Sequence, residues 1–332
     1  MAQPIQIALS GAAGRIGYSL VFRIAAGGLF GGGQPVALRL LESPGVGWDR
    51  LRAMEMELRD CAFPLMVDLC IGTNPVEVFK GSDWVVLLGS HAPREGIRRA
   101  DLLRENAPIF ADHGRAISEA APTARIMVVA NPCNANCLLA KSFAKNVPAD
   151  RWFALNRVDR MRATWFLAEK AGVPVSKVTR MTVWGNHGER VYPDFRNAFI
   201  DGRPAPEVIT DTAWVREQFE PAVSNRSREV LHLCGTSPAA TAAQAILGTI
   251  RAITLPTPFD RRFGASVVSD GSYGVPQGLI FGFPLASEDG RNWKIIQGLY
   301  HDAYAQDRLA QNVAEIEHDM AIINDLLGNV RY

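Results

Sequence analysis

Three residues of the sequence supply the side chains that acid–base chemistry on a carboxylic acid requires. Asp159 and Arg162 lie three positions apart on a predicted helix, and therefore on one face, while His187 follows in the run Trp-Gly-Asn-His. Taken singly, the pair fits an exposed salt bridge and the histidine fits a packed or surface residue. Together they offer a guanidinium to hold a carboxylate and an imidazole to move a proton. These three side chains indicate a redox reaction only if an electron acceptor binds nearby.

A glycine-rich turn near the start of the sequence is a candidate binding site for such an acceptor. Gly11, Gly14 and Gly17 follow a strand predicted at residues 5–10 and precede a helix predicted at 18–26. These glycines permit a tight turn, a close approach of backbone to a pyrophosphate, and close packing of the helix on the sheet. The free N–H groups of the helix N-terminus favour phosphate. Alone, the spacing fits a simple strand-to-helix turn equally well.

An acidic residue after the second predicted strand indicates which dinucleotide the turn favours. Glu42 ends the strand predicted at residues 36–41, 25 residues after Gly17. Its carboxylate would accept hydrogen bonds from the adenosine ribose and repel a 2′-phosphate, which favours NAD over NADP. The alternative is a solvated loop acid. We prefer the cofactor interpretation because the glycine-rich turn and the acid follow successive strands.

The elements that must position these residues alternate between strand and helix in the first half of the chain. Two further apolar runs, residues 84–88 and 126–130, each end at a turn-forming residue. Continuous apolarity is typical of strands buried on both faces, and hence of a parallel sheet covered by helices. The sequence therefore predicts an α/β fold with a doubly wound, Rossmann-type sheet, whose ligands bind at the carboxyl ends of the strands.

The end of the sequence is predicted to be scaffold. A β-like run is expected at residues 294–299. From Leu309 to Leu327, apolar residues recur at gaps of three and four, which predicts an amphipathic helix ending near Gly328. Core packing explains this apolar stripe better than a coiled-coil partner does, because fewer than three full heptads are present.

Composition excludes several classes of protein. The 332 residues suffice for about two domains, and Lys+Arg 35 against Asp+Glu 34 gives no overall attraction to nucleic acid or membrane. No apolar run approaches the ~18–20 residues of a membrane span. Five cysteines without a C-x-x-C pair or a zinc spacing predict reduced thiols and no metal site. We expect no signal or transit peptide, and hence a cytoplasmic protein.

Longer segments resemble the malate dehydrogenases, in the cytosolic-type branch of the lactate/malate dehydrogenase superfamily. The similar segments are GAAGRIGYSLVFRIA, MELRDCAFPL, ANPCNAN, RVDRMRA, VWGNHGERVYPD and SDGSYGVPQGLIFGFP, which together span nearly the whole chain. The resemblance implies a Rossmann NAD-binding domain at residues 1–155 and a mixed α/β substrate-binding domain at 156–332. It also implies NAD-dependent interconversion of a 2-hydroxy acid and its 2-oxo acid, with (S)-malate and oxaloacetate as the expected pair.

The resemblance assigns roles to the matching residues. His187 matches the acid–base histidine, Asp159 the carboxylate that orients it, and Arg162 the guanidinium that clamps the C1 carboxylate of the substrate. Arg99 matches the arginine that polarises the reacting carbonyl when a loop closes. The residues expected to line the substrate site are Arg162, Arg94, Asn131 and Ser237. Those expected to contact NAD are Gly11, Gly14, Arg15, Ile16, Gly17, Glu42, Gly89 and Asn131.

The loop after Gly89 departs from the family pattern. Arg99 keeps its register before Asp101, but the place of the arginine that reads the second carboxylate holds Pro93, with Arg94 one position later. A shift of one residue moves the backbone by ~3.8 Å, which takes a guanidinium out of bidentate reach. A monocarboxylic, aromatic or bulkier 2-oxo acid is therefore the alternative substrate. A solvated basic lid is the alternative interpretation of Arg94.

Two further expectations concern partners and function. The segment around residues 54–60 resembles the subunit-contact region of the family, which predicts a homodimer or a dimer of dimers. The partners expected otherwise are a small-molecule substrate and no nucleic acid or membrane. A non-catalytic NAD-binding protein is an alternative function, but such a protein needs only the glycine-rich turn and not the acid–base residues.

Overall fold

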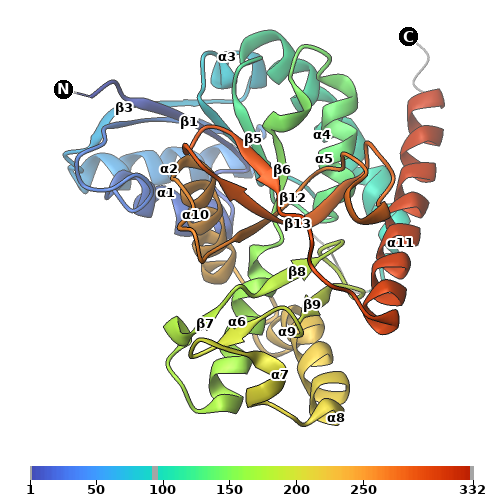
Figure 1. Cartoon of the computed structure of the whole chain (residues 1–332). Helices are drawn as coiled ribbons and strands as arrows, with labels where there is room; N and C mark the ends of the chain where they lie inside the picture. Colours follow the sequence, from blue (N-terminus) through green and yellow to red (C-terminus); the bar gives the residue numbers. More distant parts are fainter. Residues whose placement is uncertain (1, 92–95, 330–332) are drawn as a thin grey trace. The chain divides into compact units, whose positions relative to one another are not determined.

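The computed structural model describes residues 2–91 and 96–329, and Figure 1 shows the whole chain. The chain forms two compact units. Unit 1 comprises Met1–Ala154, Ala242–Leu247 and Asp319–Tyr332, and unit 2 comprises Leu155–Thr241 and Gly248–His318. Both units are discontinuous in sequence, whereas the predicted domains meet at a single boundary near residue 155, which stays a prediction.

Unit 1 contains a parallel sheet, which confirms the predicted Rossmann-type fold. Its strand order is β6-β5-β4-β1-β2-β3, and all neighbours in it pair parallel. β4 is wholly buried because apolar residues occupy both of its faces. β1 pairs with both β2 and β4, and this is where the chain changes direction across a doubly wound sheet and where ligands bind. The strands are β1 Ile5–Ser10, β2 Val36–Leu41, β3 Met66–Gly72, β4 Trp84–Leu87, β5 Arg125–Val128 and β6 Trp152–Ala154.

Helices connect the strands of unit 1. α1 begins at Arg15, three residues before the predicted helix, because Gly14 has the extended backbone of an N-cap. α4 and α5 lie side by side (Figure 1), and Gly114 allows this contact, since a Cβ there would lie 2.2 Å from the carbonyl oxygen of Ala140. The helices are α1 Arg15–Ala25, α2 Val46–Asp60, α3 Pro75–Phe79, α4 Arg99–Ala120 and α5 Cys133–Phe143, with a 3-10 turn at Ala149–Arg151.

Unit 2 combines antiparallel strands with helices, which agrees with the predicted mixed α/β second domain. β13 pairs antiparallel with β12 and β14, β10 with β7 and β11, and β8 with β9. The strands are β7 Val178–Thr179, β8 Thr182–Trp184, β9 Tyr192–Asp194, β10 Phe199–Ile200, β11 Arg203–Pro204, β12 Phe263–Val268, β13 Ile280–Ser287 and β14 Trp293–Ile295. The helices are α6 Arg157–Ala171, α7 Ala205–Val208, α8 Thr212–Trp214, a π-helix at Val215–Phe219 and α9 Glu220–Cys234, with 3-10 turns at Val175–Lys177 and Ser272–Gly274. α10 Ala240–Thr254 and α11 Ala303–Asn329 contribute residues to both units.

The core of unit 2 is built around α6. Leu167 of this helix belongs to one buried cluster with Val183 of β8 and Phe219 of the π-helix. The same helix buries Asp159 and Arg162, which are 2% and 9% exposed. Burying ionisable groups costs free energy unless they have partners. The local fold therefore sets these two residues apart from an ordinary exposed helical pair.

The strand predictions agree with the structure except near the end of the chain. The run at 84–88 forms β4, and the run at 126–130 forms β5, each displaced by one or two residues at its ends. The β-like run at 294–299 is wrong beyond Ile295, where β14 ends. Gly298 has φ +78°, a left-handed conformation that turns the chain away from a strand.

The apolar stripe predicted near the end of the chain lies on α11. Leu309, Ile316 and Ile323 on this helix are at most 6% exposed. Such burial agrees with core packing. Within the two ranges that the structure describes, no helix combines the length and apolarity that spanning a membrane needs.

Candidate active site

His187 follows β8 in a short loop of unit 2. Its Nδ1 lies 2.5 Å from Oδ2 of Asp159, which occupies the first turn of α6. A carboxylate in this position accepts a hydrogen bond from Nδ1–H and so fixes the tautomer in which Nε2 exchanges a proton. The Asp159 side chain is 2% exposed and that of His187 is 18% exposed. The orienting acid is therefore buried, while the imidazole is accessible to a ligand.

Arg162 lies one turn further along α6, and Asp159 links it to the histidine. Its Nη1 is 3.1 Å from Oδ1 of Asp159, so each carboxylate oxygen serves one partner. Its Nη2 donates to the hydroxyl of Ser227 on α9 at 2.6 Å. Burial lowers the pKa of Arg162, and the negative charge of Asp159 opposes this shift. A guanidinium shielded from water in this way is suited to a charge-assisted, bidentate contact with a substrate carboxylate.

The backbone before His187 is held in place by two glycines. Gly185 has φ +88°, which favours glycine, and it exchanges hydrogen bonds of 3.2 and 2.9 Å with Gly282 of β13. A Cβ at Gly282 would lie 2.7 Å from the carbonyl oxygen of Gly185. The indole of Trp184, just before this bridge, donates to Asp194 at 3.0 Å. The loop that carries His187 therefore starts from a fixed point.

The glycine-rich turn forms one wall of an open groove in unit 1. A Cβ at Gly11, where φ is +63°, would lie 2.5 Å from the Cα of Gly89, and one at Gly17 would lie 2.1 Å from the carbonyl oxygen of Ala12. The groove has a volume of about 660 Å³, and its walls include Ser10, Gly11, Gly14, Glu42, Gly89 and His91. The backbone of this turn has no room for side chains and lies beside the N-terminus of α1. Such a turn suits the phosphates of a dinucleotide.

Glu42 extends from the end of β2 into the same groove. Its Oε2 accepts a hydrogen bond from the backbone N–H of Ala13 at 3.2 Å, and its Oε1 accepts from that of Ser43 at 2.9 Å. Oε1 also accepts from the hydroxyl of Ser43 at 3.3 Å, so Oε2 is the oxygen that keeps an acceptor site for a ribose hydroxyl. Glu42 thus lies in the wall of the groove, and its contact with a ribose stays a prediction.

The other residues expected near the cofactor are more dispersed. Arg15 and Ile16 form the first turn of α1 and are not among the described residues that line the groove. Asn131 follows β5, and its carbonyl oxygen accepts from Nδ2 of Asn106 at 3.4 Å. Asn106 is fully buried on α4, and its Oδ1 accepts from the backbone N–H of His91 at 2.7 Å. One side chain thus joins the segment after β4 to the turn after β5.

His113 on α4 also lines the groove, and sequence reasoning missed it. Its ring packs edge-on against Phe79 and Phe110 and is 7% exposed. Burial lowers the pKa of His113 to about 4, so the ring is neutral at pH 7. A single histidine within a helical pattern gives no signal that would separate it from an ordinary core residue.

Arg99 begins α4 and pairs with Asp319 of α11 within unit 1. Its Nε lies 3.0 and 3.1 Å from the two carboxylate oxygens, and its Nη2 lies 2.6 Å from Oδ2. Asp319 is 2% exposed, so leaving it unpaired would be costly. To polarise a substrate carbonyl, Arg99 would therefore have to share Asp319 with the substrate or exchange it for the substrate. Arg94 and Pro93, on which the second carboxylate contact depends, lie outside the described residues.

Ser237 occupies an exposed segment between α9 and α10. A role of Ser237 in the substrate pocket stays a prediction. The hydroxyl that contacts Arg162 is that of Ser227, which the sequence did not reveal because the two residues are 65 positions apart. The predicted set of Asp159, Arg162 and His187 is thus brought together in unit 2. The predicted glycines and Glu42 are brought together in unit 1.

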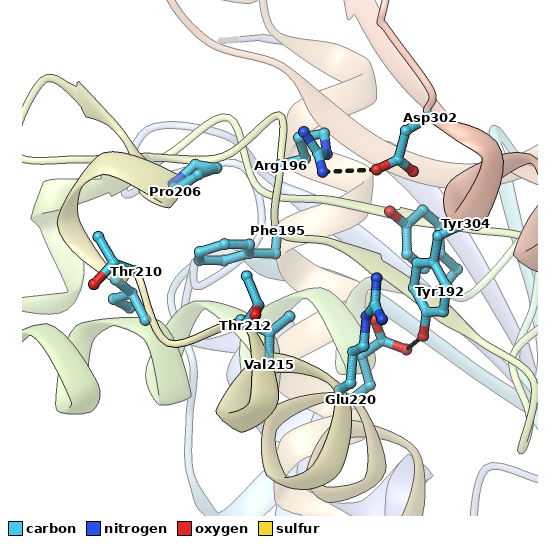
Figure 2. A pocket seen from close by; sticks show the side chains of 12 residues that line it. Tyr192, Phe195, Arg196, Pro206, Thr210, Thr212, Val215, Glu220, Asp302 and Tyr304 are labelled. Carbon is cyan, nitrogen blue, oxygen red and sulfur yellow. Dashed lines mark hydrogen bonds and ion pairs between the residues drawn. The ribbon is translucent and has the colours of Figure 1, made fainter.

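A smaller cavity of unit 2 is lined by none of the predicted site residues (Figure 2). Within it, Arg196 pairs with Asp302 at 2.6 Å, and the hydroxyl of Tyr304 donates to Glu220 at 2.8 Å. Burial raises the pKa of Glu220, and the hydrogen bond from Tyr304 opposes this shift. Because these polar groups pair with one another, we assign the cavity to the scaffold of the unit.

Metal and disulfide chemistry find no support in the part of the chain that the structure describes. No group of three or more His, Cys, Asp or Glu side chains there is arranged to hold a metal ion. All five cysteines are free thiols, two of them exposed at Cys61 and Cys234. Burial raises the pKa of the Cys137 thiol.

Two family models match the chain, one in each half. Lactate/malate dehydrogenase, NAD binding domain, matches residues 5–153, and lactate/malate dehydrogenase, alpha/beta C-terminal domain, matches residues 156–325. A malate dehydrogenase from Magnetococcus marinus is 42% identical over 327 residues, which are 98% of this chain and 99% of that protein.

Solved structures give the same result. A malate dehydrogenase from Naegleria fowleri superposes with a TM-score of 0.93 at 33% identity, covering 98% of this chain and 99% of its own. A Trichomonas vaginalis lactate dehydrogenase in complex with NADH and oxamate also gives 0.93, at 31% identity, covering 98% and 100%. Both similarities extend over both units of the chain.

Proposed function

The chain belongs to the lactate/malate dehydrogenase family and is an NAD-dependent oxidoreductase, and from this premise we propose that it interconverts (S)-malate and oxaloacetate. The observation that carries the proposal is the arrangement of His187, Asp159 and Arg162 in unit 2. It provides an acid–base group, its orienting carboxylate and a carboxylate-binding cation within one turn of helix and one loop. The 42% identity to a malate dehydrogenase supports the choice of substrate.

The residues of unit 1 fit the dinucleotide that the family uses. The glycine positions that leave no room for a Cβ suit the phosphates, and the carboxylate of Glu42 suits the ribose; both lie at a groove with a volume of about 660 Å³. Gly11, Gly14 and Gly89 line the groove and would contact the phosphates, Gly17 would let α1 pack closely beside them, and Glu42 would contact the adenosine ribose. When bound, the nicotinamide supplies the acceptor and donor of the hydride.

The chemistry of the chain's own residues follows from the geometry of unit 2. Arg162 binds the C1 carboxylate, which places the reacting carbon near the imidazole. As malate is oxidised, Nε2 of His187 accepts the hydroxyl proton; in the reverse direction it returns that proton to the carbonyl oxygen. Asp159 holds Nδ1–H throughout and stabilises the protonated ring. Arg99 belongs to unit 1, and its role rests on the family resemblance alone: it would stabilise the developing charge on the carbonyl oxygen, for which it must release or share Asp319.

Steady-state rates with a panel of 2-oxo acids test the substrate. With NADH as reductant, kcat/KM for oxaloacetate should exceed that for pyruvate, phenylpyruvate and 2-oxoglutarate. A preference of more than ~100-fold for an acid without the distal carboxylate, about 2.7 kcal/mol in transition-state binding, would replace malate by the monocarboxylic alternative. That outcome would agree with the displaced Arg94 of the loop.

We also propose that the protein is a homodimer in the cytoplasm, acting in the tricarboxylic acid cycle. Support for the dimer is the resemblance of residues 54–60, at the end of α2, to the family's contact region, where the side chain of Met56 is exposed. Free thiols at Cys61 and Cys234 suit a reducing compartment. Light scattering should give twice the chain mass of 36.3 kDa, and a monomer mass would refute the dimer.

A further inference from the structure

Side chains on one face of α11 form hydrogen bonds with the loop that carries His187. Asn312 and Glu315 lie on this face and bond to the loop at residues 186 and 190. Arg308, one turn earlier on the same face, donates to the carbonyl oxygen of Val191 at 3.3 Å. Residues at spacings of three and four share a helix face, so these hydrogen bonds come from a single stripe of polar side chains.

Asn312 makes the central contacts of this stripe. Its Oδ1 accepts from the backbone N–H of Asn186 at 3.0 Å, and its Nδ2 donates to the carbonyl oxygen of Arg190 at 2.6 Å. Nδ2 also donates to the carbonyl oxygen of Arg308 at 2.9 Å, which fixes the amide on its own helix. The two loop contacts lie one residue before and three residues after His187. The amide therefore brackets the residue that moves the proton.

The fit between this amide and the loop leaves no free space. Asn312 is 0% exposed, and a Cβ added to Gly185 would lie 2.1 Å from its Oδ1. Glycine at 185 is thus required both for φ +88° and for the approach of Asn312. A buried amide whose donors and acceptor all have partners holds its neighbours in one geometry.

Neighbouring side chains hold the loop less completely. Glu315 accepts from the side chain of Asn186 at 2.7 Å, and its own side chain is 17% exposed. Asp159 fixes the direction of the imidazole through Nδ1, whereas Asn312 bonds to the backbone of the loop on both sides of the histidine. Asp159 therefore sets the orientation of the imidazole ring. Asn312 sets the position of the backbone from which the ring projects.

We propose that Asn312 is a positioning residue for His187, which keeps Nε2 where it can exchange a proton with the substrate. This inference rests on the proposed function, since it takes the acid–base role of His187 as given. Acid–base catalysis needs the reacting atoms within hydrogen-bond reach, and a displacement of ~1 Å can cost 10²-fold in rate. The residue acts through the loop and does not itself touch the substrate.

Substitution of Asn312 tests the proposal through kcat. In Asn312→Ala, kcat for oxaloacetate reduction should fall ~10–100-fold, while KM and the Kd for NADH change by less than about threefold. The primary isotope effect with NADH deuterated at the transferred position should rise, because hydrogen transfer becomes the slow step. Asn312→Asp keeps the acceptor for Asn186 but loses the donor to Arg190, and should reduce kcat in the same direction.

Leu309→Ala is the matched control. Leu309 is buried on the same helix but lines a different surface of unit 2, away from the loop. It should lower the melting temperature as Asn312→Ala does and leave kcat and the isotope effect unchanged. Equal losses of kcat in the two variants would reduce Asn312 to a structural residue and overturn the proposal, as would an unchanged kcat in folded Asn312→Ala.

Hydrogen exchange on the wild-type protein gives an independent readout if the variants fail to fold. The backbone amide of Asn186 should be protected, because its partner is the buried Oδ1 of Asn312. Rapid exchange of this amide would overturn the proposal. Absence of oxaloacetate reduction by the wild-type enzyme would instead refute the proposed function, so the two failures are distinguishable.

Discussion

Unit 2 holds its candidate catalytic residues by side-chain hydrogen bonds, whereas unit 1 shapes its candidate cofactor groove with backbone. Asp159 uses its two carboxylate oxygens for His187 and Arg162. In the turn beside the groove, by contrast, Gly11 and Gly17 matter because a single added carbon would collide with backbone. Turnover should therefore be lost when one atom of a side chain in unit 2 is replaced. Binding of the cofactor should be weakened when one carbon atom is added to a glycine of unit 1.

The largest effect is expected from Asp159→Asn in unit 2. The amide keeps the size of the carboxylate but removes its charge and replaces one of its two acceptor oxygens by an NH2 donor, so His187 and Arg162 cannot both keep their partner, and kcat should fall by ~10³–10⁴. Asp211→Asn, at the exposed N-cap of α8, is the control and should leave kcat unchanged. NADH absorbance measures turnover, and NADH fluorescence should give an unchanged Kd, since the groove lies in unit 1. A weakened Kd with normal kcat would reverse the assignment of the two units.

A methyl group at Gly17 should have the complementary effect. In Gly17→Ala the new carbon would lie 2.1 Å from the carbonyl oxygen of Ala12, which must shift along with the phosphate-binding turn. We expect the Kd for NADH to rise at least ~10-fold, about 1.4 kcal/mol, with a lower melting temperature. Gly32→Ala, where no atom lies within 4 Å of the new carbon, should change neither quantity. Equal affinity in both variants would contradict the backbone-shaped groove.

Cofactor choice gives a smaller effect within unit 1. Glu42→Gln removes the charge that repels a 2′-phosphate, so the ratio of kcat/KM for NADPH to that for NADH should rise by ~10-fold. Glu55→Gln on α2, where the partly buried carboxylate pairs with Arg59, serves as the control. An unchanged ratio would return Glu42 to the role of a solvated loop acid.

Residues whose role only one kind of side chain can fill were predictable from the sequence. Residues whose role depends on contacts far apart in the sequence were not. The glycines of the turn and the Asp159, Arg162 and His187 set stand out because few other side chains could replace them. Ser227 and Asn312 were missed because their partners lie 65 and 126 residues away, beyond any local pattern. The alternating strands and helices of unit 1 were predicted because buried parallel strands are continuously apolar.

The smallest effect is expected on stability, from Glu220→Gln in the scaffold of unit 2. Burial raises the pKa of Glu220 in the folded state, so its favourable contribution is present below the unfolded pKa and is lost as pH rises through the folded pKa. Glutamine keeps an acceptor for Tyr304 and removes the buried charge. At pH 8 the free energy of unfolding should rise by up to ~1 kcal/mol, and near pH 4 the two proteins should be equal. Denaturant unfolding at both pH values checks this; a loss at pH 8 would contradict it.

The most direct test of the central claim, that the imidazole of residue 187 exchanges the substrate proton, is turnover of His187→Asn with oxaloacetate and NADH. Asparagine keeps a polar side chain beside Asp159 but cannot take up or release a proton at neutral pH. We predict a reduction of kcat by ~10²–10⁴ with the Kd for NADH unchanged. Turnover equal to that of the wild-type enzyme would remove His187 from the mechanism and contradict the account.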